Sequence, residues 1–431
     1  MKDKFDCIVV GAGPAGISAA LTLVRAGLKT VVIERGEYPG TKNVMGGILY
    51  TRPLEELIPE FWKEAPLERH IIEQRVMLVS KDASTSFSYK SKQLDEPPYN
   101  SYSIMRATFD RWFASKAESA GAIIINETLV ESLIVENDKV IGVRTGRADG
   151  ELYADLVIDA EGVNSILARD LGLHPEIPEH NVALAVKEIL ALPREVIEAR
   201  FNLKAEQGTA IELVGDISAG MMGIGFIYTN KESLSLGIGC LISDLRKSGM
   251  QPYDLLDRFK EHPMIQPLIE GAQTKEYSAH LIPEGGYRAI PPLCADGFLV
   301  AGDAAGLVNS VHREGSNLAI TSGRLAAQTV IEAKKKNDFT CRALSLYKKL
   351  LDQSFVMKDL KKYRNFPAIM EKNKHFFTTY PSLLSDSAYE MIKVDGVPKK
   401  TKQWKIIKNF IKGRSLWGLV KDGFNLLRAI G

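Results

Sequence analysis

The hydrophobic and polar positions at the front of the chain predict a strand, a helix and a second strand in succession. Residues 5–10 are a short apolar run that ends in glycine, as buried strands often do. Residues 17–25 carry apolar side chains at helical spacing, and Gly27 ends this helix. Residues 30–33 are a second apolar run, which ends at Glu34. The chain therefore starts with a strand–turn–helix–strand unit of the kind that opens a parallel sheet.

The periodicity changes further along the chain. Alternating residues predict strands within 71–90, and a helical pattern follows at 104–122. Shorter apolar runs predict strands at 123–125, 129–135, 140–145 and 156–158. From 181 to 290 apolar and polar residues alternate with few helical stretches, as in an antiparallel sheet. After a strand at 297–300, helical patterns dominate over 316–328, 334–374 and 402–430.

These elements predict an α/β (α+β) fold with three parts. A Rossmann-like nucleotide-binding domain is expected to combine residues 1–75, 100–180 and 290–333. An antiparallel β-sheet domain for the substrate, at 76–99 and 181–289, would be inserted into it. Residues 334–431 are expected to form a helical C-terminal region.

The turn after the first strand has the spacing G-x-G-x-x-G, with glycines at 11, 13 and 16. Gly11 permits the tight turn, Gly13 lets backbone approach a pyrophosphate, and Gly16 lets the helix pack closely. The helix start offers free N–H groups to phosphate, and the Glu34 carboxylate can accept hydrogen bonds from a ribose diol. Because strand, helix and acid are all in place, the unit predicts dinucleotide binding. The alternative is a glycine-rich turn in an ordinary α/β domain.

Residues 36–51 are polar and rich in glycine, so they are expected to form a loop along the ligand. Gly46 and Gly47 would let the backbone come near a flat ring; the alternative is a flexible surface loop. Arg106, where the 104–122 helix starts, would pair with a phosphate or be an ordinary surface arginine.

A second motif follows the strand at 297–300. Gly302 and Asp303 come directly after that strand, and a carboxylate fixed there can bind a polyhydroxy chain. Gly315 opens a helix whose first turn can direct free N–H groups at developing negative charge. Gly162 provides a tight turn after the strand at 156–158.

Composition narrows the classes of function. The net charge of the 431 residues is +2, so no strong field recruits nucleic acid. The cysteines at 7, 240, 294 and 341 are scattered singly and no C-x-x-C occurs, so no metal site or iron–sulfur cluster of the usual spacing is expected. This cysteine usage fits a reducing cytosol. We expect no signal peptide and no membrane-spanning helix.

The C-terminal tail, residues 402–430, is amphipathic. Lys402, Lys405, Lys408 and Lys412 are expected on one side of a helix, opposite Trp404, Ile406, Ile407, Phe410 and Ile411. After Gly413, a second apolar face is expected from Leu416, Trp417, Val420, Phe424 and Leu427. A lysine-rich helix with tryptophans suits a membrane surface; the alternative is docking on this chain's own core or on a partner.

With the second motif in place, the chain resembles the two-motif FAD proteins of the hydroxylase and geranylgeranyl-reductase superfamily. The resemblance implies that Asp303 binds the ribityl chain and that the backbone around Gly315 and Ser316 faces the flavin N1–C2=O edge. Glu161 stands before Gly162, where the family more often has aspartate. The residues expected to bind FAD are Gly11, Gly13, Ala15, Gly16, Glu34, Arg35, Gly46, Gly47, Arg106, Gly162, Gly302, Asp303, Gly315, Ser316 and Asn317.

Four further stretches, at 38–47, 279–293, 306–319 and 376–400, resemble the FixC branch of the electron-transfer-flavoprotein:quinone oxidoreductases. The resemblance implies an enzyme that takes electrons from the alpha and beta subunits of an electron transfer flavoprotein and reduces a membrane quinone, menaquinone or ubiquinone. It also implies a FixABCX-type complex at the inner face of the cell membrane. There a ferredoxin-like FixX subunit would carry a [4Fe-4S] cluster, and NADH electrons would be bifurcated between quinone and ferredoxin.

Two other functions stay open on the sequence. One is a flavin-dependent reductase or monooxygenase acting on an isoprenoid or aromatic substrate, and the other is a flavin-binding subunit without chemistry of its own. For quinone reduction, the FixC-like stretches suggest His312, Arg313 and Tyr287 near the quinone oxygens. Among these three residues, only His312 has an ordinary pKa suited to proton delivery near neutrality. The alternative for His312 is a structural hydrogen bond.

Overall fold

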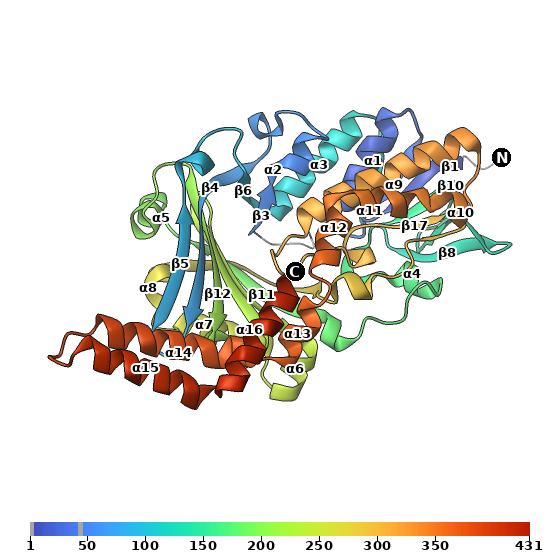
Figure 1. The fold of residues 1–431 in the computed structure, drawn as a ribbon. Helices are drawn as coiled ribbons and strands as arrows, with labels where there is room; N and C mark the ends of the chain where they lie inside the picture. The colour runs from blue at the N-terminus through green and yellow to red at the C-terminus, as the bar shows by residue number, and fades with distance from the viewer. Residues whose placement is uncertain (1–3, 42–45) are drawn as a thin grey trace. The chain divides into compact units, whose positions relative to one another are not determined.

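The computed structural model describes residues 4–41 and 46–431 and divides into two compact units. Unit 1 combines Met1–Leu67, Ile104–Val182 and Leu281–Arg364. Unit 2 combines Glu68–Ser103, Ala183–His280 and Asn365–Gly431. Figure 1 traces the chain from blue to red through both units. Two sheets and a helical C-terminal region confirm the predicted α/β (α+β) class, while the predicted three-domain boundaries stay a prediction.

The sheet of unit 1 has the strand order β16-β17-β10-β1-β2-β7, and its strands are parallel except for β16, which runs antiparallel to β17. These strands are β1 (Lys4–Val10), β2 (Thr30–Ile33), β7 (Ile123–Ile125), β10 (Glu151–Asp159), β16 (Cys294–Ala295) and β17 (Phe298–Val300). β1 pairs in parallel with β10 and β2, and β10 pairs in parallel with β17. Antiparallel strands β8 (Val130–Glu136) and β9 (Lys139–Thr145) continue from β10. This is the predicted Rossmann-like arrangement.

Helices of unit 1 pack along one another beside this sheet, and Figure 1 shows α1, α3 and α9 as neighbours. The helices are α1 (Pro14–Arg25), α2 (Thr51–Glu55), α3 (Arg106–Ser119), α4 (Ile166–Asp170), α9 (Ser316–Lys336), α10 (Cys341–Leu344), α11 (Leu346–Gln353) and α12 (Phe355–Lys362). Short 3-10 turns are η1 (Phe61–Lys63), η3 (Gly162–Asn164), η4 (Glu179–Asn181), η6 (Gly286–Ala289) and η7 (Gly302–Ala305). Strand side chains such as Ile8 and Val157 are fully buried, as parallel strands covered by helices require.

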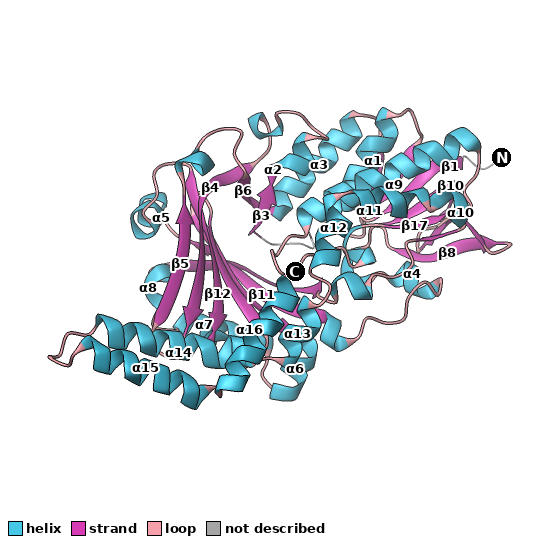
Figure 2. Cartoon of the chain, viewed as in Figure 1, coloured by secondary structure: helices cyan, strands magenta, loops and turns pink. Residues whose placement is uncertain are grey.

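Unit 2 contains the second sheet, which has the order β15-β11-β14-β13-β12-β4-β6, with β5 paired to β4 (Figure 2). Its strands are β4 (Leu67–Val79), β5 (Ser84–Lys90), β6 (Ser101–Met105), β11 (Val182–Ala191), β12 (Gln207–Gly215), β13 (Gly223–Thr229), β14 (Ser233–Leu241) and β15 (Gln273–Pro283). Most neighbours are antiparallel, but β12 and β4 run parallel. Buried side chains such as Ile211, Leu236 and Phe259 form its core.

The helices of unit 2 flank this sheet. They are α5 (Arg194–Phe201), α6 (Ile242–Ser248), α7 (Pro252–Glu261), α8 (Gln266–Ile269), α13 (Phe366–Lys372), α14 (His375–Ile392), α15 (Lys399–Gly413) and α16 (Leu416–Ile430), with 3-10 turns η2 (Lys92–Asp95) and η5 (Asp216–Ser218). α14 and α15 lie side by side, and α16 packs on α13 (Figure 1). The predicted tail helices are therefore present.

One expectation is wrong, and one cross-link was not expected. The predicted loop at 36–51 contains strand β3 (Gly46–Tyr50) and ends at the first residue of α2, because Ile48, Leu49 and Tyr50 supply side chains suited to a strand and Leu49 is fully buried. The four cysteines are scattered singly along the sequence, but Cys294 and Cys341 form a disulfide. That bond joins residues 47 positions apart, a separation at which sequence gives no pairing signal.

Candidate cofactor site

The first glycine motif forms a tight turn between β1 and α1. Gly11 has φ 100°, and a Cβ atom there would come within 2.4 Å of the Ala160 oxygen. A Cβ on Gly16 would come within 1.9 Å of the Gly11 oxygen. A Cβ on Gly13 would meet nothing within 4 Å, so this residue borders open space. Gly13 is also the N-cap of α1 and no side chain caps the helix, which leaves N–H groups available to a phosphate.

The two glycine motifs meet where α1 and α9 pack. A Cβ on Gly323 would come within 2.0 Å of the Ala15 oxygen, so the helices approach at backbone distance. The Ser18 hydroxyl donates to the Ile320 oxygen at 2.6 Å. Gly302 donates its backbone N–H to Ser322 Oγ at 3.0 Å. The structure therefore brings the Gly11–Gly16 turn and the Gly302–Asp303 turn together within unit 1.

Glu34 lies at the end of β2 and is held by backbone. Its Oε2 accepts the N–H of Ala12 at 2.9 Å, and its Oε1 accepts the N–H of Gly36 at 2.7 Å. These bonds fix the carboxylate against the glycine turn. Each oxygen keeps a second acceptor position, which is the geometry that ribose recognition needs.

Asp159, at the end of β10, is a residue that the sequence analysis missed. It is fully buried, accepts the Glu161 N–H at 3.0 Å, and its Oδ2 has no partner among the described residues. Burial raises the pKa of Asp159 to about 8, and the charge of Glu161 adds to the effect. Burial also raises the pKa of Glu161, while Arg35 opposes it. In the sequence, the only sign of a role for Asp159 is its position at the end of a strand, just before the turn at Gly162, which has φ 76°.

Asp303 and Arg106 lie within electrostatic reach of each other. Burial raises the pKa of Asp303, and the Arg106 charge works against that rise. Arg106 itself makes a two-point ion pair with Asp110, with Nε–Oδ1 and Nη2–Oδ2 both at 2.7 Å. The arginine is therefore anchored on α3 rather than free on the surface. Its predicted contact with phosphate stays a prediction.

The first turn of α9 is open. Its N-cap Gly315 makes no side-chain cap, and a Cβ there would meet nothing within 4 Å. Asn317 is buried, and its Oδ1 has no partner among the described residues. The Ser316 and Asn317 N–H groups thus begin a long helix beside a buried polar atom, an arrangement that suits the carbonyl edge of a flavin.

These features fit FAD on physical grounds. Gly13 and Gly315 leave room at two helix starts, and the 3-10 turn carrying Asp303 lies with them in unit 1. Gly47 is buried in β3; residues 42–45, and the burial of Gly46, lie outside the described part of the chain. Contacts of Ala15, Arg35, Gly46 and Gly47 with the cofactor stay predictions.

His312 lies in a loop whose backbone is hydrogen-bonded to the side chain of Asn309. Asn309 Oδ1 accepts the N–H of Val311 at 3.2 Å and that of His312 at 3.4 Å. The His312 ring nitrogen Nε2 is 2.8 Å from the Tyr363 hydroxyl. Arg313, the next residue, has φ 54°, a left-handed conformation uncommon outside glycine. The structural hydrogen bond considered for His312 is present, and Tyr363 is a second partner that the sequence did not indicate.

Tyr287 lies in turn η6, which packs against α12, the helix that Tyr363 caps. No direct contact between Tyr287 and His312 is recorded among the described residues. Glu284, just before this turn, is a further residue that the sequence analysis missed. Burial raises its pKa to about 7, and a hydrogen bond from Ser310 opposes the rise. Unit 1 therefore gathers proton-exchanging groups on the loops at 284–287 and 309–313.

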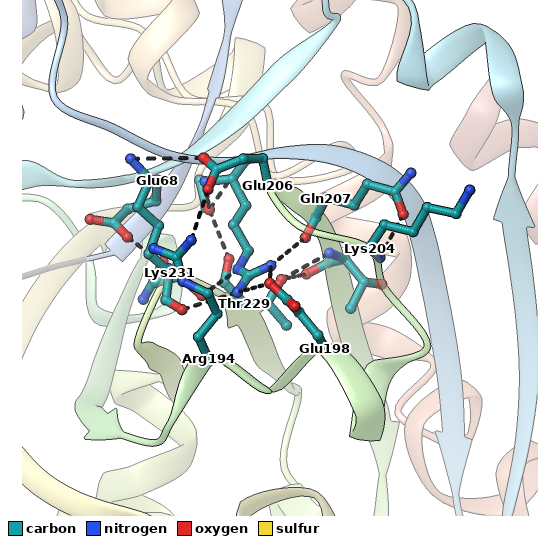
Figure 3. A network of polar contacts seen from close by, with 12 residues as sticks. Glu68, Arg194, Glu198, Lys204, Glu206, Gln207, Thr229 and Lys231 are labelled. Carbon is teal, nitrogen blue, oxygen red and sulfur yellow. Dashed lines mark hydrogen bonds and ion pairs between the residues drawn. The ribbon is translucent and has the colours of Figure 1, made fainter. Parts of the chain in front are cut away.

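A buried arginine network stands apart in unit 2 (Figure 3). The Arg69 side chain is 1% exposed and donates to the backbone oxygens of Asn230, Gln207 and Lys231 at 2.7, 3.0 and 3.0 Å. It also pairs with Glu198 at 3.2 Å. Because its donors are occupied by the protein itself, this network fixes the sheet rather than binding a ligand.

The last helix, α16, has inverted amphipathicity, and α15 also exposes apolar side chains. On α16 the buried residues are Asp422 and Ala429, whereas Trp417, Phe424 and Leu427 are 85%, 60% and 67% exposed. On α15 the predicted polar position Lys402 is wrong, because its side chain is 2% exposed and its Nζ binds Asp395 at 2.7 Å. Apolar side chains therefore face outward over both helices.

Within residues 4–41 and 46–431, no helix is long and apolar enough to cross a membrane. In the same ranges no group of three or more His, Cys, Asp or Glu side chains is placed to hold a metal ion.

Comparisons with known proteins support FAD as the cofactor. Residues 366–431 match the ETF-QO/FixC family C-terminal domain, and residues 4–206 match an FAD binding domain. Protein FixC of Azotobacter vinelandii is 56% identical over 100% of both chains. Protein FixC of Rhizobium meliloti is 50% identical over 99% of both. The probable electron transfer flavoprotein-quinone oxidoreductase YdiS of Escherichia coli is 43% identical over 98% of both.

Solved structures share the fold. A geranylgeranyl bacteriochlorophyll reductase-like protein from Thermoplasma acidophilum has a TM-score of 0.74 at 22% identity, over 97% of this chain and 98% of its own. The flavin-dependent brominase Bmp2 has a TM-score of 0.61 at 16% identity, over 94% of each chain.

Proposed function

Because the chain belongs to the FixC family of FAD-dependent flavoprotein oxidoreductases, we propose that it passes electrons from an electron transfer flavoprotein to a membrane quinone. The observation that carries this proposal is the end-to-end identity with FixC proteins, which includes the C-terminal domain at 366–431. Within a FixABCX-type complex, the alpha and beta flavoprotein subunits would deliver the electrons. A ferredoxin-like FixX subunit would carry the [4Fe-4S] cluster, and the assembly would bifurcate NADH electrons between quinone and ferredoxin.

The residues of unit 1 hold the cofactor in this scheme. The uncapped start of α1 at Gly13 receives the pyrophosphate, Glu34 receives the ribose, and Asp303 receives the ribityl chain. The open first turn of α9 at Gly315–Asn317 would present its N–H groups to the flavin ring and would favour negative charge there. When bound, FAD supplies the two-electron chemistry that amino-acid side chains lack.

Quinone reduction also requires protons and hydrogen-bond donors. His312 and Tyr363 form one pair of titratable groups at 2.8 Å, and Arg313 and Tyr287 supply further donors on neighbouring segments. We assign His312 to proton delivery, with Tyr363 fixing the orientation of its ring. Arg313 and Tyr287 donate to the quinone oxygens in this scheme.

The tail supplies the route to the membrane surface. The outward apolar residues of α15 and α16 are accompanied by exposed lysines, including Lys405, Lys408 and Lys412. This combination suits a helix pair lying in the interface of an anionic membrane. We propose peripheral attachment at the inner face of the cell membrane, where quinone is available.

Anaerobic reduction of the flavin-loaded chain tests the function. NADH or NADPH alone is expected to leave the flavin oxidised. NADH with the electron transfer flavoprotein, the ferredoxin-like subunit and a menaquinone analogue is expected to give quinone-dependent NADH turnover. Rapid bleaching of the flavin by NADPH alone would instead place the chain with reductases or monooxygenases that act on isoprenoid or aromatic substrates.

A further inference from the structure

Cys294 and Cys341 differ from the other two cysteines in their surroundings. Cys294 is the first residue of β16 and Cys341 is the first residue of α10, and both are half-buried. Their Cα atoms are 5.6 Å apart, within the usual range for a disulfide, and the structure joins them. Cys7 and Cys240 are buried, and burial raises the pKa of the Cys240 thiol to about 12. Of the four cysteines, only Cys294 and Cys341 are both close to each other and partly accessible to solvent.

Hydrogen bonds that do not involve sulfur hold the two segments together. The Cys341 N–H donates to Asp296 Oδ1 at 2.6 Å, and the Gly297 N–H donates to the Phe339 oxygen at 2.8 Å. β16 is also paired with β17 at Cys294 and Leu299. The two sulfur atoms therefore stay adjacent when the bond between them is broken, so the pair can open and close without a large movement of the chain.

The ring closed by this pair contains the whole second flavin motif. Between the two cysteines lie β17, the Gly302–Asp303 turn, the His312 loop and α9. A cross-link between residues 47 positions apart restricts the unfolded chain strongly, because the effect grows with the length of the closed loop. Closing the ring thus stabilises the segment that holds one side of FAD.

We propose that Cys294 and Cys341 form a reversible thiol–disulfide site whose oxidation makes the chain retain FAD more firmly. One cysteine thiolate attacks a low-molecular-weight disulfide such as oxidised glutathione and releases one glutathione thiol. The second thiolate attacks the resulting mixed disulfide and releases the other. The two cysteines lose two electrons and two protons, which the two glutathione thiols carry away. A dithiol reductant reverses both steps.

Differential alkylation of the full-length, FAD-loaded chain tests the site. The protein is equilibrated at a series of ratios of reduced to oxidised glutathione and treated with N-ethylmaleimide under native conditions, and its peptides are then mapped by mass spectrometry. We expect the peptides of Cys294 and Cys341 to shift together from alkylated to cross-linked as the buffer becomes more oxidising. Cys7 and Cys240 serve as internal controls that stay unlabelled. Independent alkylation of both half-buried thiols in the oxidising buffer would refute the pairing.

Flavin release tests the consequence. The temperature at which FAD fluorescence appears is expected to be several degrees higher for the oxidised than for the reduced chain. Cys294→Ser is expected to release FAD at the reduced value in either buffer. Equal release temperatures in a chain shown by mapping to be cross-linked would overturn the link to flavin retention. Because the unmodified chain is compared in two buffers, this test does not depend on whether the variant folds.

Discussion

Asp422 and Arg414 form a two-point ion pair, with Nε–Oδ2 at 2.6 Å and Nη2–Oδ1 at 2.8 Å. Asp422 is buried on the inner face of α16, and its Oδ2 also accepts the Tyr380 hydroxyl at 2.8 Å and lies 2.9 Å from His375 Nε2. One carboxylate therefore fastens the last helix to α14 and to the end of α15. An inverted helix needs such an anchor, because its apolar residues face away from the protein.

Removing this anchor is expected to loosen α16. Asp422→Ala leaves Arg414 and its neighbours without their shared acceptor, which costs about 3 kcal/mol of the docking free energy of the helix. Hydrogen exchange of residues 416–430 should rise while exchange in unit 1 is unchanged. Asp386→Ala, at an exposed position on α14, is the matched control. Unchanged protection of α16 in Asp422→Ala would show that apolar packing holds the helix instead.

Acid should release the same helix. Burial alone would raise the pKa of Asp422, but the hydrogen bonds and charges of Arg414, Tyr380 and His375 outweigh it and lower the pKa to about 2. The stabilisation is complete above the unfolded aspartate pKa of about 3.9, and it disappears as the pH falls from there toward 2. Pepsin cleavage within α16 should accelerate over this interval. In Asp422→Asn the cleavage rate should lack this pH step.

Two glycine substitutions should separate cofactor binding from folding. In Gly13→Ala the new methyl group meets no protein atom within 4 Å but enters the space assigned to the pyrophosphate. We expect the FAD affinity to fall at least about tenfold, or roughly 1.4 kcal/mol, with little change in the unfolding of the apoprotein. In Gly16→Ala the methyl group meets the Gly11 oxygen at 1.9 Å, so stability and affinity should fall together. Fluorescence titration with FAD and thermal unfolding of the apoproteins measure both. If Gly13→Ala binds FAD with unchanged affinity, the pyrophosphate does not bind at this turn.

The buried arginine network of unit 2 should contribute far more to stability than a surface ion pair. Arg69→Met removes donors from buried carbonyl groups and leaves Glu198 unpaired, which is expected to cost about 3 kcal/mol or more in the free energy of unfolding. Arg194→Met breaks only a pair with Glu206 whose side chains are 38% and 50% exposed, and should cost less than about 1 kcal/mol. Denaturant unfolding compares the two. Equal losses of unfolding free energy in Arg69→Met and Arg194→Met would mean that the buried network does not stabilise the fold.

The outward face of α16 should bind membranes without supporting the fold. Trp417→Glu with Phe424→Glu places charges at positions that are 85% and 60% exposed, so thermal stability should be unchanged. Co-sedimentation with vesicles containing anionic lipid should be lost. The control is Tyr253→Glu, at a 56% exposed position on α7, which should sediment as the unmodified chain does. If the double variant still sediments with the vesicles, the outward face of α16 does not bind the membrane.

The sequence predicts the glycine turns and the parallel core well, because both depend on local patterns. Gly11, Gly16 and the apolar strand runs have few alternatives once a strand–turn–helix unit is recognised. The structure bears out the tight approach at these glycines and the strand at 298–300.

What sequence could not supply depends on contacts between distant segments. The His312 partner lies 51 residues away at Tyr363, and Asp159 is buried at a position where its strand is paired with β1 on one side and β17 on the other. Lys402 was misplaced because helical periodicity gives two faces without saying which one faces the protein. The apolar face of an amphipathic helix usually packs against the protein, whereas the apolar face of α16 points toward solvent.

The strand order of unit 1 also constrains how the protein is made. β1 and the first glycine turn leave the ribosome at the start of translation, but β10, which pairs with β1, starts only at Glu151, and β17, which pairs with β10, starts only at Phe298. The helix α9, which packs on α1 through Gly323, ends at Lys336. The nascent chain therefore carries an incomplete nucleotide fold through most of its synthesis. We therefore expect flavin to bind only after α9 has been synthesised.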